Sequence, residues 1–302
     1  DQFSPSKVKQ YVHEFFKNDF GTSRRVWENI ERNWSLLRAC QNPLILSFTC
    51  IVNDDGRDPQ GLRLNRLYSK ICSKILAAQW KDWKGQLPPD WISNPIRLET
   101  RQRQLARISL ALFEKNPSGN RFDQRTWEKA AGEAAGLRSA AAAVFLEDLQ
   151  KLGMISISDE TPYGDNYYSF RHRTLFEYLA ACGLKELPKE SWLDRVTSHV
   201  WFDTAWSEIL RFLAGASDTT KLIEYVRDQH RNCDDAFGSM IQLCCKLTGD
   251  SGLGETEQER ELVQNVVSEA FKYWKTSIDT GNIELIRSAS LSIRSLSQNV
   301  TA

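Results

Sequence analysis

The feature that most constrains this chain is a change of hydrophobic period at Met154. Upstream of it, apolar residues recur at spacings of three and four, which predicts amphipathic helices. Residues 154–158 and 167–171 alternate instead, and the turn-rich residues between them predict a β-hairpin. The helices expected ahead of the hairpin are 98–115, one that Asp123 caps, and 140–152. Three helices followed by a two-stranded wing is the pattern of a winged-helix domain.

A histidine stands where the hairpin ends and the next helix begins. His172 follows the second strand directly, and an amphipathic helix follows His172. The buried face predicted for that helix consists of Leu175, Phe176, Leu179, Ala180 and Gly183. Taken alone, this position is typical of a histidine that caps its own helix or packs against the hairpin.

The residues before the winged helix are predicted to form a small helical domain. Helices are expected at 6–17, 24–33 and 62–83, because their apolar side chains share one face. In the first helix that face is Val8, Tyr11, Val12, Phe15 and Phe16. Three prolines between residues 88 and 95 then interrupt the pattern. We therefore predict three domains, at 1–90, 91–187 and 188–302.

The apolar run 44–52 has two interpretations. It fits a buried strand, which would make Asp54 and Asp55 resemble a magnesium-binding pair. It also fits a buried helix that starts at Pro43, since proline is favoured in the first helical turn. We favour the helix, because the chain contains no phosphate loop for such a strand to serve.

The last third of the chain is predicted to be an all-helical arm. Apolar periodicity indicates helices at 200–214, 221–229, 236–247, 257–276 and 282–295, with a glycine-containing loop at 248–255. Pairs of helices of modest length resemble a HEAT-like repeat array, although no exact internal repeat is present.

Composition narrows the classes of function. The 302 residues contain 39 Lys and Arg and 39 Asp and Glu, so the net charge argues against a globally basic nucleic-acid binder. The helix at 137–152 is too acidic and apolar to read a DNA groove, so DNA is not an expected partner. Four of the seven cysteines, Cys40, Cys50, Cys72 and Cys182, lie among apolar neighbours, which predicts a reducing, cytoplasmic compartment. No apolar run is long enough for a bilayer and no signal peptide is visible, so membrane contact is not expected.

The sequence offers no catalytic or metal motif of its own. Its four histidines are scattered, and no Ser/His/Asp or Cys/His nucleophile arrangement is visible. His230 and Cys233, with Cys244 and Cys245, match no zinc spacing, so core thiols are the preferred interpretation. We therefore do not expect this chain to be an enzyme by itself.

Four features in order resemble the NACHT class of STAND signalling ATPases, which includes NOD-like receptors and bacterial defence proteins. They are Gln-Asn-Pro-Leu-Ile-Leu at 41–46, the helix with Leu67 and Tyr68, Phe-Arg-His-Arg-Thr-Leu-Phe-Glu-Tyr-Leu-Ala-Ala at 170–181, and the helical stretch 199–215. The residues of the 170–181 motif are slightly more similar to those of bacterial members. The family usually has Phe-Gln where this chain has Leu175 and Phe176.

The resemblance implies a regulatory segment that lies C-terminal to a nucleotide-binding domain. That upstream domain would hold ADP or ATP with magnesium, and this segment would close over the nucleotide. Nucleotide exchange would then control homo-oligomerisation in signal transduction, innate immunity or antiviral defence. A protein ligand on the helical arm is a further expected partner.

The resemblance also implies which residues meet the nucleotide. His172 would reach the β-phosphate of ADP, Pro43 would pack on adenine, and Asn42 and Leu44 would shape that pocket. Arg173 would add charge near the phosphates, or would pair with an acid instead.

Two further points stay open. Nothing physical makes Glu177 and Tyr178 catalytic, and a salt bridge or hydrogen bond at the edge of the core is the preferred interpretation for this pair. The alternative function is a helical-repeat scaffold that binds another protein without nucleotide, with the winged helix as a spacer.

Overall fold

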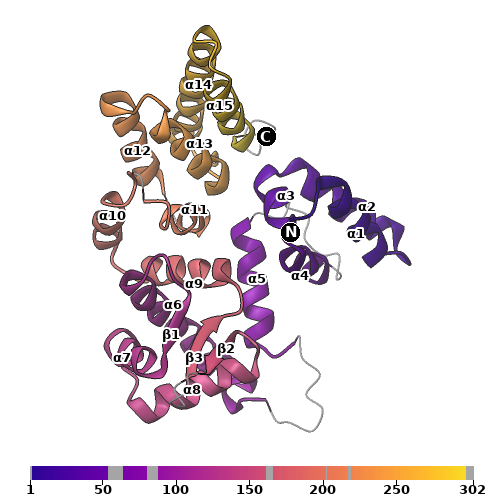
Figure 1. Ribbon diagram of the computed structural model, residues 1–302, viewed down its shortest axis with the longest axis vertical. Helices are drawn as coiled ribbons and strands as arrows, with labels where there is room; N and C mark the ends of the chain where they lie inside the picture. The colour runs from indigo at the N-terminus through magenta and orange to yellow at the C-terminus, as the bar shows by residue number, and fades with distance from the viewer. Residues whose placement is uncertain are drawn as a thin grey trace. The chain divides into compact units, whose positions relative to one another are not determined.

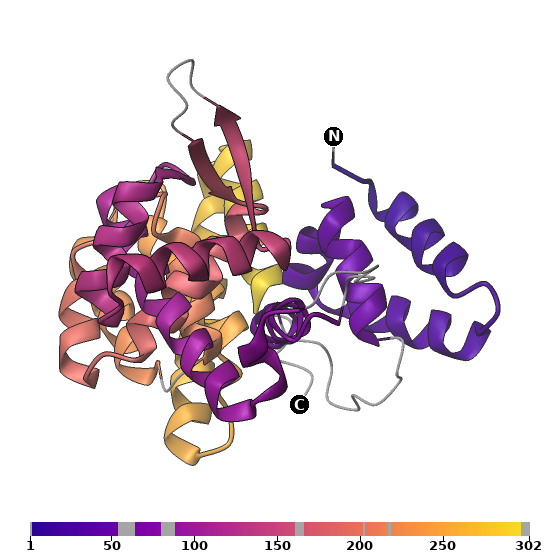
Figure 2. The same ribbon diagram turned by 90° about the horizontal axis from the view of Figure 1, so that it is seen from below.

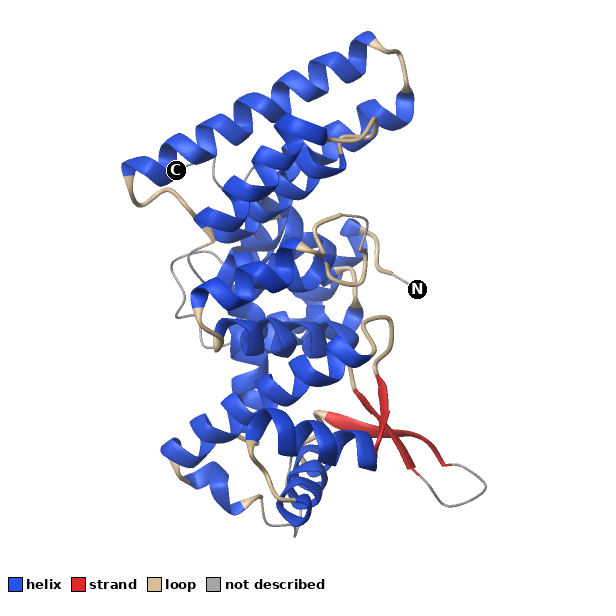
Figure 3. Ribbon diagram, turned by 90° about the vertical axis from the view of Figure 1, so that its left-hand side faces the viewer, coloured by secondary structure: helices blue, strands red, loops and turns tan. Residues whose placement is uncertain are grey.

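The computed structural model describes residues 2–53, 64–79, 88–160, 166–201, 203–216 and 219–296. Within these ranges the chain forms fifteen α-helices, one short 3-10 helix and three strands (Figure 1). The strands form a single antiparallel sheet, drawn in red in Figure 3. The predicted mainly α fold is therefore confirmed.

The chain divides into two compact units. The first consists of Asp1–Leu67, Thr197–Phe202 and Ala214–Ala302, and the second of Tyr68–Val196 and Asp203–Leu213. Three of the points where the chain passes from one unit to the other lie inside helices, which are α5 (Leu64–Leu76), α10 (Lys189–Thr197) and α11 (Ser207–Ala216). The three predicted domains stay a prediction.

Four helices occupy the N-terminal part of the first unit, coloured indigo to purple in Figure 2. They are α1 (Pro5–Phe15), α2 (Phe20–Arg32), α3 (Trp34–Cys40) and α4 (Pro43–Asn53). Val8, Val12 and Ile30 are fully buried among them. The predicted buried face was wrong at Phe15, which is 40% exposed because Phe16 takes the inner position and Phe15 lies against its ring.

The helical interpretation of residues 44–52 is correct. These residues lie within α4, which begins at Pro43, and Ile45 and Leu46 are buried. A proline at the first position of a helix loses no hydrogen bond, because that N–H has no intrahelical partner. Asp54 and Asp55, considered above as a metal-binding pair, lie outside the described residues.

The C-terminal part of the first unit consists of α12 (Thr220–Cys233), α13 (Ser239–Ser251), α14 (Glu257–Asp279) and α15 (Ile283–Ser295). Each of these helices packs against the next one in the chain. The predicted loop at 248–255 was wrong at its start, because α13 continues to Ser251. Gly249 lies inside this last turn and allows a close approach to α15, since a Cβ there would lie 1.9 Å from the carbonyl oxygen of Ser295.

The second unit contains a winged-helix domain. Its elements are α6 (Pro95–Lys115), β1 (Arg121–Asp123), α7 (Gln124–Ala135), α8 (Ser139–Lys151), β2 (Ile155–Glu160) and β3 (Asn166–Phe170). The strand order is β1-β3-β2, with Tyr168 of β3 paired to Phe122 of β1 and to Ile157 of β2. Asp123 caps α7 as predicted, because its Oδ1 accepts from the amide of Thr126 at 2.6 Å.

Strand β1 is absent from the sequence prediction. Three residues are too few to show alternation, and β1 gains its strand conformation by pairing with β3. The predicted helix 140–152 is present as α8, but Val144 is 53% exposed and lies on its outer face.

The remaining elements of the second unit include α9 (Arg173–Lys185) and parts of the chain before and after it. They are η1 (Asp90–Ser93), α10 (Lys189–Thr197) and parts of α5 and α11. Helix α11 starts later than the predicted residue 200, because Asp203 closes a turn in which its carbonyl oxygen accepts from the amide of Trp206 at 3.1 Å. Helices α6 and α9 pack closely at Gly183, where a Cβ would lie 2.5 Å from the carbonyl oxygen of Ala106.

Candidate functional site

The candidate site is the start of α9 in the second unit. His172 leaves β3 in an extended conformation, with φ of −140° and ψ of 129°, and occupies the N-cap position of the helix. Its carbonyl oxygen accepts from the amides of Leu175 and Phe176 at 3.1 and 3.3 Å, while its side chain makes no capping hydrogen bond. His172 therefore caps its own helix through the backbone, and the half-buried ring is held by other contacts.

A hydrogen-bonded chain fixes the imidazole of His172. The phenol of Tyr68 donates to Oγ1 of Thr174 at 2.9 Å, and the same oxygen is hydrogen-bonded to Nδ1 of His172. Each of these bonds needs one hydrogen. In the tautomer with the ring hydrogen on Nε2, the Thr174 hydroxyl donates to Nδ1; in the other tautomer, Nδ1–H donates to the second lone pair of the same oxygen.

Burial keeps His172 uncharged near neutral pH. Removal of the ring from water lowers the pKa of His172 below its ordinary value of 6.5, because the charged imidazolium loses hydration. A neutral ring whose Nδ1 accepts a hydrogen bond presents Nε2–H as a donor without a full positive charge. The backbone dipole at the start of α9 favours an anion near this donor.

Arg173 is committed to contacts within the second unit. Its Nε donates to Oε1 of Glu177 at 2.7 Å, and its two terminal nitrogens donate to the carbonyl oxygens of Pro117 and Ser118. The sequence left two roles open for Arg173, and the structure shows the ion pair with an acid. The guanidinium ties the loop between α6 and β1 to the first turn of α9.

The salt bridge predicted for Glu177 is confirmed. Glu177 is 4% exposed, and burial raises its pKa, although Arg173 opposes this shift by stabilising the carboxylate. Tyr178, the other half of the pair, packs against Tyr68 and Phe212 with ring centroids 5.9 and 5.5 Å apart. Both residues therefore act in the core beside the site.

The structure adds Asn120 to this cluster. Its Nδ2 donates to the carbonyl oxygen of Phe170 at 2.8 Å, two residues before His172. Its Oδ1 is buried and accepts no hydrogen bond from any described residue. A buried amide oxygen without a donor is costly, so this position favours a ligand or water that donates a hydrogen bond. Nothing in the sequence distinguishes Asn120, because asparagine in a turn-rich loop is common.

The other three predicted ligands lie in the first unit. Oδ1 of Asn42 accepts from the amide of Leu44 at 2.9 Å and so stabilises the first turn of α4. Pro43 is exposed, and Leu44 is 36% exposed. The two side chains give the start of α4 a small apolar surface, so Pro43 both begins a helix and leaves its ring accessible.

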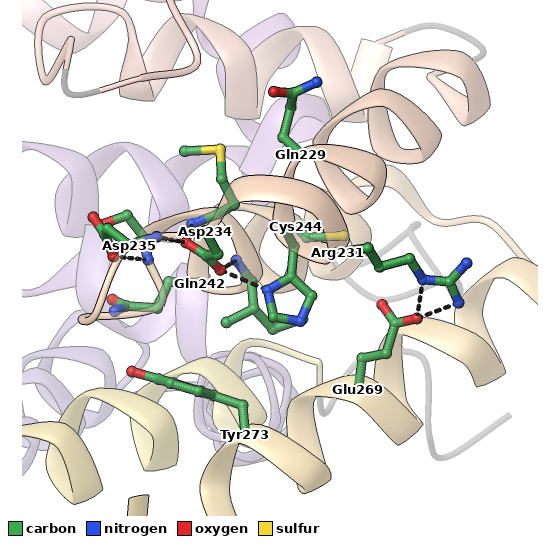
Figure 4. Close-up of polar contacts among 12 residues, drawn as sticks. Gln229, Arg231, Asp234, Asp235, Gln242, Cys244, Glu269 and Tyr273 are labelled. Carbon is green, nitrogen blue, oxygen red and sulfur yellow. Dashed lines mark hydrogen bonds and ion pairs between the residues drawn. The ribbon is translucent and has the colours of Figure 1, made fainter. Parts of the chain in front are cut away.

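A second polar cluster lies at the turn between α12 and α13 (Figure 4). The carboxylate of Asp234 accepts from the amides of Met240 and Ile241 and from Nδ1 of His230 at 2.5 Å. These bonds cap α13, and together they lower the pKa of Asp234 against the effect of burial. Figure 4 also shows Arg231 facing Glu269.

The cysteines considered for a metal site differ in burial. Cys244 and Cys245 are fully buried and Cys233 is exposed. In the part of the chain that the structure describes, no three His, Cys, Asp or Glu side chains are grouped so as to hold a metal ion. The cluster is therefore interpreted as a helix cap with an adjacent Arg–Glu network.

Comparisons with known proteins leave the chain without an assigned family. No protein-family model matches the sequence. No curated protein shows significant similarity to it. Among the described helices, none combines the length and the apolar character needed to cross a bilayer.

Proposed function

We propose that this chain is the regulatory lid and lever of a NACHT-type signalling ATPase that acts in the cytoplasm. The observation that carries the proposal is the state of His172, an uncharged, half-buried imidazole at the N-cap of α9, directly after the wing. In this proposal its Nε2–H donates to the β-phosphate of ADP held by an upstream nucleotide-binding domain. The dipole of α9 adds favourable interaction with the same anion.

The other predicted ligands take separate roles in the proposal. Pro43 and Leu44 provide the apolar surface for adenine, and Asn42 keeps that helix start in place. Arg173 supports the site by holding the loop at Pro117 and Ser118 rather than by contacting phosphate. Magnesium and the phosphate loop belong to the upstream domain.

The nucleotide would act as a switch. ADP bound to His172 would favour a closed state, because the contact exists only when the lid lies over the nucleotide. Exchange for ATP would remove that contact and release the winged helix and arm, which permits homo-oligomerisation. Innate immune or antiviral signalling fits such a device.

The test is the substitution His172→Leu in the full-length protein, which includes the upstream domain. We expect at least about tenfold weaker ADP retention and more oligomer without trigger, since one hydrogen bond to a charged group is lost. Arg171→Gln is the matched control, because Arg171 is the exposed neighbour of His172. Unchanged ADP affinity in the His172→Leu variant would sink the proposal. A phosphate loop encoded upstream is the simplest supporting observation.

A second candidate function is a nucleotide-independent scaffold for another protein. The observation that favours it is Phe237, which is 67% exposed at the turn before α13. Its carbonyl oxygen accepts from Gln242 Nε2 at 2.7 Å and from the hydroxyl of Tyr273, and its amide donates to Asp235 at 2.9 Å. A backbone fixed in this way presents an aromatic ring to solvent at low entropic cost. The absence of an encoded phosphate loop upstream would favour this candidate.

A further inference from the structure

A cleft of about 380 Å³ opens beside the first half of α6 in the second unit. It lies between η1 and α6, and Leu137, which precedes α8, closes one side. This volume falls within the range of small-molecule sites. The cleft contains none of the residues discussed above as nucleotide ligands, so it is a separate feature of the winged-helix domain.

Arg101 supplies a positive charge to this cleft that no carboxylate neutralises directly. Its guanidinium lies 4.7 Å from the ring centroid of Phe145, and its Nη1 donates to Oε1 of Gln104 at 3.0 Å. Within the described part of the chain, Arg101 forms no ion pair, because the two nearest carboxylates are engaged elsewhere. Asp90 pairs with Arg97 at 3.3 Å.

Asp148 is the other nearby carboxylate, and it too has different partners. It accepts from Nε1 of Trp91 at 2.8 Å and lies 3.9 Å from Nζ of Lys151. Asp148 and Asp90 act on Arg101 only through longer-range attraction, which raises its pKa. Burial has the larger effect and lowers the pKa of Arg101 below its ordinary value. A partly buried guanidinium with incomplete charge compensation gains more from an anion than a solvated one does.

The walls of the cleft are divided by polarity. One face of α6 brings Arg97, Arg101 and Gln104 to it at spacings of four and three. Ile96, which is 77% exposed, and the half-buried Leu137 supply apolar surface. With two arginines and Asp90 on the walls, the lining carries a net charge of one positive unit, which suits a single negative charge.

We propose that this cleft binds a small organic monoanion, in which a carboxylate is carried on an apolar body. The carboxylate would accept from the guanidinium of Arg101 and the amide of Gln104, and the apolar body would cover Ile96 and Leu137. Planar carboxylates match the fork of an arginine side chain, which favours them over other anions of the same charge.

The experiment is a titration of the full 302-residue chain with benzoate, followed by NMR at the indole N–H of Trp91, which lines the cleft. The signal is assigned with Trp91→Phe. We expect saturable binding, and at least about tenfold weaker binding of benzyl alcohol, which has the same ring without the charge. Equal binding of the two probes, or no binding of benzoate, would overturn the proposal.

Two variants and a control complete the test. Arg101→Gln should weaken benzoate binding by at least about tenfold. Ile96→Asp should also weaken benzoate binding, because the new carboxylate repels the anion. Ile96 is exposed, so this variant folds and tests the cleft even if Arg101→Gln does not fold. Arg103→Gln is the control, because Arg103 pairs with Glu99 and is not part of the cleft. Binding to both cleft variants with the affinity of the wild type would refute the assignment.

Discussion

The phenol of Tyr68 donates a hydrogen bond to the hydroxyl of Thr174 at 2.9 Å, across 106 positions of sequence. Thr174 in turn bonds to Nδ1 of His172, so α5 and the start of α9 are joined through the side chain on which the proposed function depends. The tautomer of His172 is thereby a property of tertiary structure, since Tyr68 is brought to Thr174 only by folding.

The first prediction concerns this tautomer. Thr174→Val removes the hydroxyl that is hydrogen-bonded to Nδ1, so the tautomer ratio of the ring should move toward that of a free imidazole, and the free energy of unfolding should fall by about 1–2 kcal/mol. Nitrogen chemical shifts of the His172 ring above its pKa measure the tautomer directly. Thr174→Ser, which keeps the hydroxyl, should behave as the wild type. An unchanged ring in Thr174→Val would show that Thr174 does not orient it.

The second prediction is a pH dependence of stability. The pKa of His172 is lowered from 6.5 in the folded state, so between that lower value and 6.5 the unfolded chain binds more protons. The contribution of His172 is therefore fully present above pH 6.5 and is lost as the pH falls through its folded pKa. Denaturant unfolding between about pH 7 and 5 should show a smaller loss of stability in His172→Gln than in the wild type. Equal losses in the two proteins would contradict the assignment.

The third prediction separates a buried ion pair from an exposed one. Arg173→Met leaves the carboxylate of Glu177 buried without its cation and removes the donors to Pro117 and Ser118. We expect the free energy of unfolding to fall by about 2–3 kcal/mol. This is less than the usual cost of breaking a fully buried pair, because the Arg173 side chain is 37% exposed.

Arg103→Met is the matched control for that change. Its pair with Glu99 also spans four helical positions, but both side chains are more than half exposed. The expected loss is at most about 0.5 kcal/mol, because water screens such a pair. Similar losses for the two variants, measured by urea unfolding, would show that burial of Glu177 does not decide the cost.

The fourth prediction compares two glycines in helices. Gly183→Ala places a Cβ 2.5 Å from the carbonyl oxygen of Ala106 and 2.9 Å from Cβ of Leu110, so α6 and α9 must separate. We expect a loss of about 2–3 kcal/mol from this overpacking. Gly132→Ala meets only the carbonyl oxygen of Leu137 at 3.6 Å, and should gain about 0.5–1 kcal/mol from helix propensity. Thermal unfolding of the two variants should therefore shift in opposite directions.

Local sequence patterns predicted most of the helices, because the apolar residues that form the patterns are also the residues that the fold buries. Residues 24–33 and 98–115 carry apolar side chains at helical spacing, and Ile30, Ile108 and Phe113 are indeed fully buried. Pro43 and Asp123 gave correct helix starts, since the fit of proline and the capping of an amide by a carboxylate act within a few residues.

Sequence patterns failed where distant segments decide the outcome. The three residues of β1 form a strand only because β3 pairs with them, and Gly249 lies within α13, where the backbone of α15 comes close to it. Asn120 gave no signal, because its place beside Phe170 depends on how the loop after α6 meets β3. Each of these outcomes needs a partner that is remote in sequence.

Local sequence patterns are sufficient to predict a mainly α chain with a β-hairpin and a histidine at the start of the following helix. Hydrophobic period, caps and turn residues suffice for this, because they act over one or two helical turns. Folding is needed to bury half of the imidazole of His172 and to connect it through Thr174 to Tyr68. Folding also pairs Arg173 with Glu177 and with the loop at Pro117 and Ser118. Burial and hydrogen-bond partners set the charge and the tautomer of a side chain, and both depend on segments that folding brings together.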